Sequence, residues 1–166
     1  IEIFQKFEDD PESQYYLGKA YYYGIGVNKD LKKAFEFAKK SADKNNSSGL
    51  NLLGVIYQYG EGVEKDESKA FEYYKQSTDL GNTKAMRNLA SLYENGEYVK
   101  QDLSKAKELY QKLIDLNDKE GYLGFASIYT YHQYNSKEAL KYYSTFESLG
   151  GKHPNTFQNM AVLYSE

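Results

Sequence analysis

Apolar and small residues recur along the chain at helical spacing, and the pattern repeats itself. In 50–57 they stand at Leu50, Leu53, Gly54 and Tyr57, which places them on one helix face rather than in strand alternation. Matching tyrosines lie at positions 21, 57, 93 and 129, each 36 residues after the last. A second helical stripe begins near positions 30, 66, 102 and 136. The pattern therefore predicts a helix–loop–helix unit copied about four times.

The segments between the two helices of each copy carry helix stop and start signals. They read GIGVNKD at 24–30, GEGVEKD at 60–66 and GEYVKQD at 96–102. The leading glycine of each segment suits a left-handed helix C-cap. The closing aspartate suits a helix N-cap, because its carboxylate accepts a bond from an unpaired backbone N–H. We expect the valine of each segment to pack beneath the loop.

The third and fourth copies depart from this pattern. Tyr98 stands where the earlier copies have glycine, so we expect that loop to differ if the position needs a positive φ. The fourth copy is shorter between its helices and lacks glycine there. We expect a tighter link and a locally altered stacking angle.

Stacked helix pairs can bury faces that a single pair leaves exposed. We therefore predict an all-α fold, an α-α superhelix (α-solenoid) of about four helix–loop–helix repeats with a half repeat at each end. The predicted single domain, 1–166, divides into repeats 11–46, 47–82, 83–118 and 119–153, with partial copies at 1–10 and 154–166. The chain starts at Ile1 rather than Met, so we expect it to be a piece of a longer chain.

The second copy carries the fullest motif. Its residues are Leu53, Gly54, Tyr57, Gly60, Gly62, Val63, Asp66, Lys69, Ala70, Phe71, Tyr74 and Gly81. This pattern resembles the Sel-1-like repeat family, a relative of the tetratricopeptide repeat with a longer inter-helix loop. The first copy matches nearly as well, the third in part, and the fourth is degenerate. The resemblance implies a right-handed superhelix whose first helices line a concave groove, and a role as an adaptor in protein complexes.

The first helices also carry positions that the core stripe does not use, and we expect a partner protein or peptide to bind there. These first-helix positions are Tyr15, Tyr16, Lys19, Tyr22, Asn51, Leu52, Val55, Gln58, Arg87, Asn88, Ser91 and Glu94, continued by Leu123, Ser127 and Thr130. Tyrosines with an arginine and amides are typical of binding surfaces, although some of these tyrosines can instead pack between helices. Leu52 and Val55 are expected as exposed apolar side chains unless something covers them.

Charge and composition narrow the classes of partner. The chain has 21 basic and 24 acidic residues and a net charge of −3, which provides no basic surface for a nucleic acid. No apolar run approaches the roughly 18 residues of a membrane span, so we expect no membrane insertion within this segment. The absence of cysteine excludes disulfides and cysteine-based zinc sites, but leaves the cell compartment open.

Motifs for catalysis, metals and cofactors are missing, so we predict no enzyme activity and no cofactor. His132 and His153 match no metal-ligand spacing. GIG and GEG follow a helix, whereas phosphate-binding loops follow a strand. A hydrolase-like bacterial repeat protein is one alternative, weakened by the lack of cysteine, and a passive spacer in a longer array is another. Asn45 and Asn46 begin overlapping glycosylation sequons, whose use depends on the compartment.

Overall fold

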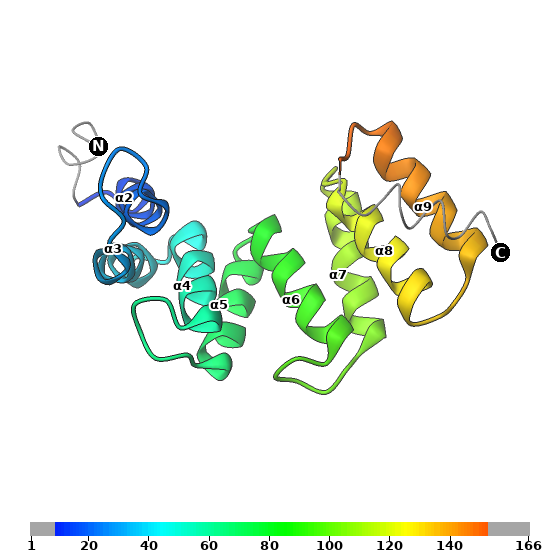
Figure 1. Ribbon diagram of the computed structural model, residues 1–166, viewed down its shortest axis with the longest axis horizontal. Helices are drawn as coiled ribbons and strands as arrows, with labels where there is room; N and C mark the ends of the chain where they lie inside the picture. Colours follow the sequence, from blue (N-terminus) through cyan, green and yellow to red (C-terminus); the bar gives the residue numbers. More distant parts are fainter. Residues whose placement is uncertain (1–8, 153–166) are drawn as a thin grey trace. The chain divides into compact units, whose positions relative to one another are not determined.

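The computed structural model describes residues 9–152, and every regular element in that range is a helix (Figure 1). The helices are α2 (Pro11–Tyr23), α3 (Leu31–Asp43), α4 (Ser47–Tyr59), α5 (Glu67–Asp79), α6 (Thr83–Asn95), α7 (Leu103–Asp115), α8 (Glu120–Tyr131) and α9 (Ser136–Ser148). The all-α prediction is confirmed for this range. The predictions for His153, for 154–166 and for most of 1–10 lie outside the described residues.

Several pairs of consecutive helices pack side by side. Contacts join α2 to α3, α4 to α5 and α8 to α9, and further contacts join α3 to α4 and α7 to α8 (Figure 1). The chain divides into two compact units, unit 1 (residues 1–86) and unit 2 (residues 87–166). The part of α6 that follows Met86 belongs to unit 2.

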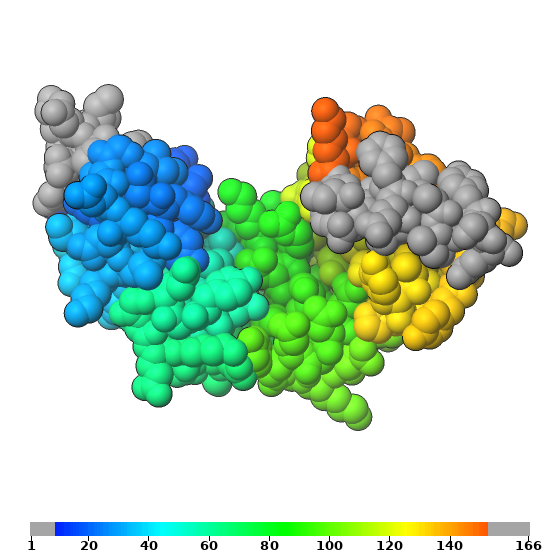
Figure 2. All heavy atoms as spheres, viewed as in Figure 1, coloured from blue at the N-terminus to red at the C-terminus, as the bar shows by residue number. Residues whose placement is uncertain are grey.

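Unit 1 has a core of aliphatic and small residues from α3 and α4. Leu53, Ile56 and Ala38 are almost fully buried in it. The pair α4–α5 approaches closely because Gly54 has no side chain: a Cβ there would lie 2.5 Å from the ring of Tyr74. On the face shown in Figure 2, the atoms of α2 to α4 form one continuous body.

In unit 2, a buried cluster joins α8 to α9, and a glycine packs against a tyrosine ring between α7 and α8. Ala126, Ala139 and Tyr143 form a buried cluster between α8 and α9. Gly124 on α8 lies against the ring of Tyr110 on α7, where a Cβ would lie 2.3 Å from the ring. A glycine on one helix therefore makes room for a tyrosine on its neighbour in both units.

The predicted helix stops are confirmed. Gly24, Gly60 and Gly96 follow α2, α4 and α6 with φ of 71°, 68° and 71°, the left-handed conformation that glycine adopts at little cost.

The predicted helix starts are confirmed as well. Asp30, Asp66 and Asp102 accept hydrogen bonds from backbone N–H groups three residues later, at 3.0, 2.9 and 3.0 Å. The donor residues at those positions are lysines, whose ammonium groups lie 5.1–5.2 Å from the ring centres of the repeat tyrosines. The second helices α3, α5 and α7 thus each begin with a cap, a cation and an aromatic ring in contact.

The atypical loops keep part of the regular geometry. Tyr98 has φ of 64°, so this position remains left-handed as at Gly62 (φ 84°), although it carries a large side chain. The shorter link of the fourth copy is confirmed, because it covers only 132–135, against 24–30 in the first copy. Tyr134 takes the positive φ there, at 49°.

Candidate functional site

Most of the predicted first-helix positions of unit 1 are accessible at the surface of α2 and α4. The Tyr16 side chain is 39% exposed and packs its ring against that of Tyr15, with 5.0 Å between the ring centres. Lys19, Asn51 and Val55 are partly exposed. An aromatic surface with a cation and an amide is therefore available on this unit.

Leu52 corrects the sequence analysis. The expectation that it is an exposed apolar side chain is wrong: it is only 6% exposed. Its Cδ2 atom lies 3.2 Å from where a Cβ of Gly18 would stand, and it shares the core of unit 1 with Ala38. Two small residues on α2 and α3 leave the volume that Leu52 fills.

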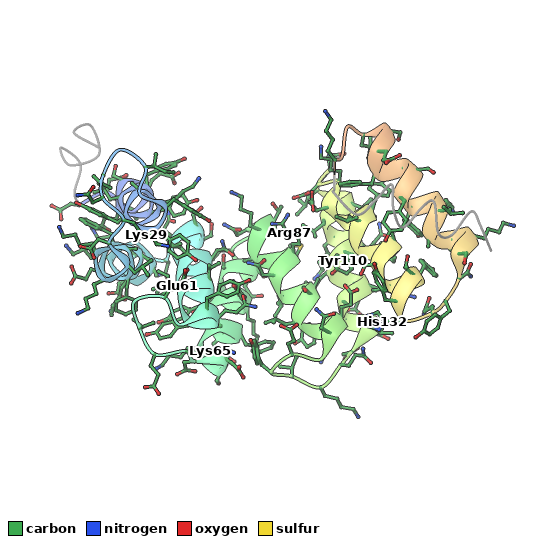
Figure 3. All side chains as sticks on the ribbon, in the orientation of Figure 1. Lys29, Glu61, Lys65, Arg87, Tyr110 and His132 are labelled. Atoms are coloured by element: carbon green, nitrogen blue, oxygen red, sulfur yellow. The ribbon has the colours of Figure 1, made fainter. Side chains whose placement is uncertain are left out.

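Tyr22 is also buried, with 8% exposure. Burial, followed by a hydrogen bond to the Glu61 carboxylate, raises the pKa of the Tyr22 hydroxyl. Lys29 lies 4.0 Å from Glu61 and 5.9 Å from the centre of the Tyr22 ring, and Figure 3 labels this lysine and glutamate. Two inter-helix loops thus meet over Tyr22, so its ring presents little surface to a partner.

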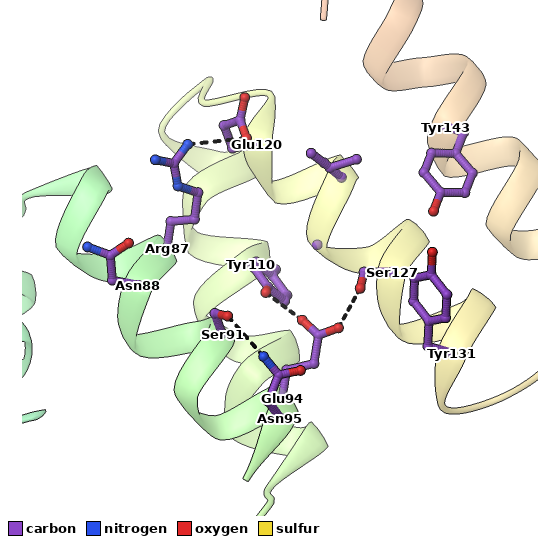
Figure 4. Close-up of a pocket in the computed structure, with 12 residues that line it drawn as sticks. Arg87, Asn88, Ser91, Glu94, Asn95, Tyr110, Glu120, Ser127, Tyr131 and Tyr143 are labelled. Atoms are coloured by element: carbon purple, nitrogen blue, oxygen red, sulfur yellow. Dashed lines mark hydrogen bonds and ion pairs between the residues drawn. The ribbon is translucent and has the colours of Figure 1, made fainter. Parts of the chain in front are cut away.

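In unit 2 the first-helix positions line a pocket of about 390 Å³ (Figure 4). α6 contributes Arg87, Asn88, Ser91 and Glu94, all of them predicted partner-binding residues. α8 provides the opposite wall, and the Tyr110 ring from α7 contributes to the lining. The structure therefore brings these four and two further predicted positions, Leu123 and Ser127, together around one cavity.

The Glu94 carboxylate is the most buried charge of this pocket, with 5% exposure. Its Oε2 accepts a 2.6 Å hydrogen bond from the Tyr110 hydroxyl, and its Oε1 accepts a 2.5 Å bond from the Ser127 hydroxyl (Figure 4). His132 Nε2 lies 3.6 Å from the same Oε1. Burial, and then the charge of Glu94, raise the pKa of Tyr110, so this phenol remains a hydrogen-bond donor at neutral pH.

The rim of the pocket holds an ion pair and an amide. Arg87 Nη1 lies 3.3 Å from Glu120 Oε2, which joins α6 to α8 (Figure 4). Asn95 Nδ2 donates to Ser91 Oγ at 3.3 Å. These groups are polar and partly exposed, so they can exchange their bonds for bonds to a ligand.

Sequence reasoning missed three exposed tyrosines at the ends of first helices. Tyr23, Tyr59 and Tyr131 are 60%, 66% and 53% exposed. Each is the last residue of its helix, and the first two directly precede the cap glycine. Their shared position in the repeat was the available signal, because such a large aromatic side chain is not needed for capping.

The described residues offer no sign of metal chemistry or of a membrane span. Within 9–152, no three His, Cys, Asp or Glu side chains gather as a metal site would require. Over the same range, no helix has both the length and the apolar character for crossing a bilayer. Ser127 and His132 both contact Glu94, which is not the arrangement in which a histidine takes the proton of a serine nucleophile.

Repeated helix pairs with common caps define this chain as a helical-repeat protein of the solenoid class. The Sel1 repeat matches residues 11–46, 47–82 and 83–118, and the chain belongs to this family. Members of the family generally mediate protein–protein interactions and are typically non-catalytic scaffolds.

Three bacterial proteins with solved structures have the same fold. A Sel1 repeat protein from Oxalobacter formigenes is 29% identical, with a TM-score of 0.77 over 86% of this chain and 59% of that one. A protective antigen of uropathogenic Escherichia coli, c5321, is 24% identical, with a TM-score of 0.83 over 98% of this chain and 36% of that one. Helicobacter pylori cysteine-rich protein B is 30% identical, with a TM-score of 0.52 over 78% of this chain and 94% of that one.

A viral protein shows the similarity in sequence. The putative Sel1-like repeat-containing protein L18 of Acanthamoeba polyphaga mimivirus is 49% identical over 41 residues, which cover 25% of this chain and 7% of that protein. This chain thus corresponds to only part of the length of L18, of the Oxalobacter protein and of c5321.

Proposed function

We propose that the chain is a scaffold that binds a partner protein or peptide on its first helices. The observation that carries this proposal is the pocket between α6 and α8, which is lined mostly by residues with polar side chains. Its volume of about 390 Å³ lies within the range of cavities that hold ligands. The family's general role in protein–protein interaction supports the same conclusion.

The exposed aromatic residues of unit 1 extend this proposal. Tyr16, Tyr23 and Tyr59 present large side chains on α2 and α4. Tyrosine contributes contact area with few rotatable bonds, so it loses little entropy when a partner covers it. We propose that a partner contacts the first helices of both units, each through its own surface.

The test is comparative capture of partners from the source cells. The variant Tyr16→Ala/Arg87→Ala removes an aromatic and a cation from first helices. The matched variant Lys32→Ala/Gln111→Ala removes two exposed side chains from the second helices α3 and α7. Proteins retained by the wild type and by the second-helix variant, but lost from the first-helix variant, would support the proposal.

Two results would contradict it. If both variants fold as judged by circular dichroism and capture the same proteins, the first helices are not the binding surface. If the wild-type chain itself captures nothing above a beads-only control, the chain acts as a spacer instead.

A further inference from the structure

Glu94 places a buried charge where the repeat does not need one. The same position of the second copy, 36 residues earlier, is Gln58. Gln58 Oε1 accepts a hydrogen bond of 2.6 Å from the hydroxyl of the buried Tyr74, and Glu94 accepts a bond of the same length from Tyr110. A neutral amide therefore satisfies the buried tyrosine as well as a carboxylate does.

Burying a carboxylate costs more free energy than burying an amide, because the charge loses its hydration. Tyr110 and Ser127 donate hydrogen bonds to Glu94 but carry no positive charge. A carboxylate has about four acceptor sites on its two oxygens, so these two bonds leave capacity for another donor. The Glu94 carboxylate is thus oriented but not neutralised by its hydroxyl partners.

The other charged side chains of the pocket do not balance the negative charge of Glu94. The charged side chains that line it are Arg87, Glu94 and Glu120. Arg87 and Glu120 form an ion pair at 3.3 Å, which offsets one charge against the other. His132, at 3.6 Å from Glu94, adds positive charge only in its protonated form. The pocket lining therefore carries a net charge of about −1 with neutral histidine.

The remaining walls suit a long aliphatic stem. Leu123 and the Tyr131 ring line the pocket, together with the Tyr110 ring that packs against Gly124. Lysine and arginine side chains bury their methylene groups on such surfaces while the charged end seeks a polar partner. Aromatic faces add a further attraction for cations.

We propose that this pocket takes a lysine or arginine side chain of the partner, with its cationic group on the Glu94 carboxylate. This inference rests on the proposed binding role and specifies the chemistry that unit 2 recognises. A charge-assisted hydrogen bond to the buried Glu94 carboxylate gives the partner an anchor point, and the partly exposed Arg87–Glu120 pair lines the same pocket.

The direct test uses Nα-acetyl-lysine methylamide as probe, titrated into the 166-residue chain labelled with nitrogen-15. Its neutral analogue, Nα-acetyl-norleucine methylamide, measures the contribution of the apolar stem. We expect the lysine probe to shift the backbone amide signals of Gly124 and Ser127, and to bind at least about tenfold more tightly than the neutral analogue. Comparable affinities for the two probes, or preferential binding of Nα-acetyl-glutamate methylamide, would overturn the inference.

The variant Glu94→Gln copies the residue that the second copy already has at this position. We expect it to fold with an unchanged or higher melting temperature and to bind the lysine probe about tenfold less tightly. Glu108→Gln makes the same change of net charge at an exposed position on α7 and should leave the affinity unchanged. An equal effect of the two variants would show that only the overall charge matters, and would overturn the inference.

A second variant adds a positive charge to the pocket instead of removing the negative one. Ser91→Lys places a cation three residues before Glu94, where it can occupy the pocket from within. We expect it to weaken binding of the lysine probe at least about fivefold, and unchanged binding would count against the inference. If Glu94→Gln still captures every partner that the Tyr16→Ala/Arg87→Ala variant loses, the inference that a basic side chain binds Glu94 fails. The broader binding role would still stand.

Discussion

At the residue scale, the aspartate caps give the protein a defined response to acid. The backbone N–H of Lys69, and then its ammonium group, hold the pKa of Asp66 below its ordinary value of 3.8. The backbone N–H of Lys105 does the same for Asp102, and that of Ser13 for Asp10. In each case the folded chain holds the proton less tightly than the unfolded chain.

The sign of the effect follows from proton linkage. Because the unfolded state binds more protons between the two pKa values, stability is greatest above about pH 4 and falls as the pH drops through the folded pKa. We expect Asp66→Asn to make the free energy of unfolding less dependent on pH, because asparagine can cap a helix without a charge. Asn46 makes the same cap bond at α4. Urea unfolding from pH 6 to pH 3 measures the slope. Asp79→Asn, at the other end of α5, is the control, and equal slopes in both variants would contradict the prediction.

Residues that act locally were predictable from the sequence, and residues that depend on a neighbouring helix were not. Gly60 and Asp66 were identified because capping needs only the backbone beside them. Leu52 was misjudged because its burial depends on Gly18, from another repeat. Glu94 was predicted only as a partner-binding residue, because charged residues are rarely buried unless paired. The sequence did carry a signal for the contact that Glu94 makes. A tyrosine follows 16 residues after Gln58 and after Glu94, at Tyr74 and Tyr110.

At the element scale, the helix pairs α3–α4 and α7–α8 are equivalent, but the large and the small side chain have exchanged helices. In unit 1, α3 presents the small Ala38 and α4 the large Leu52. In unit 2, 72 residues later, α7 presents Tyr110 and α8 presents Gly124. The backbone geometry of the repeat thus tolerates either distribution, provided that the total volume is kept.

The exchange can be tested with a double-mutant cycle in unit 2. Tyr110→Ala should cost about 3–5 kcal/mol through the cavity it leaves. Gly124→Leu should cost about 1–3 kcal/mol, because its side chain would overlap the Tyr110 ring. The double variant should recover about 1–3 kcal/mol relative to the sum, since leucine then fills the space left by the ring. Denaturant unfolding at constant pH measures all four proteins, and strict additivity would contradict the exchange.

At the scale of the whole molecule, we expect each unit to have its own local stability. Repeat proteins bury their cores between neighbouring helices, so a local defect is expected to loosen its own surroundings first. Ile56 on α4 and Ile128 on α8 are both 0% exposed and occupy the same position of their repeats, one in each unit. They provide a matched pair of core substitutions.

We expect Ile56→Ala to cost about 2–5 kcal/mol locally and to speed amide hydrogen exchange in α2 to α5. Ile128→Ala should speed exchange in α8 and α9 and leave α2 and α3 at the wild-type rate. Hydrogen-exchange mass spectrometry on the two variants, at a temperature where both remain folded, compares the same peptides in each. If both substitutions accelerate exchange equally along residues 9–152, the chain unfolds as one cooperative body. A partner that binds only unit 2 would then protect unit 1 as well, whereas independent units would confine the protection to α7, α8, α9 and the part of α6 that belongs to unit 2.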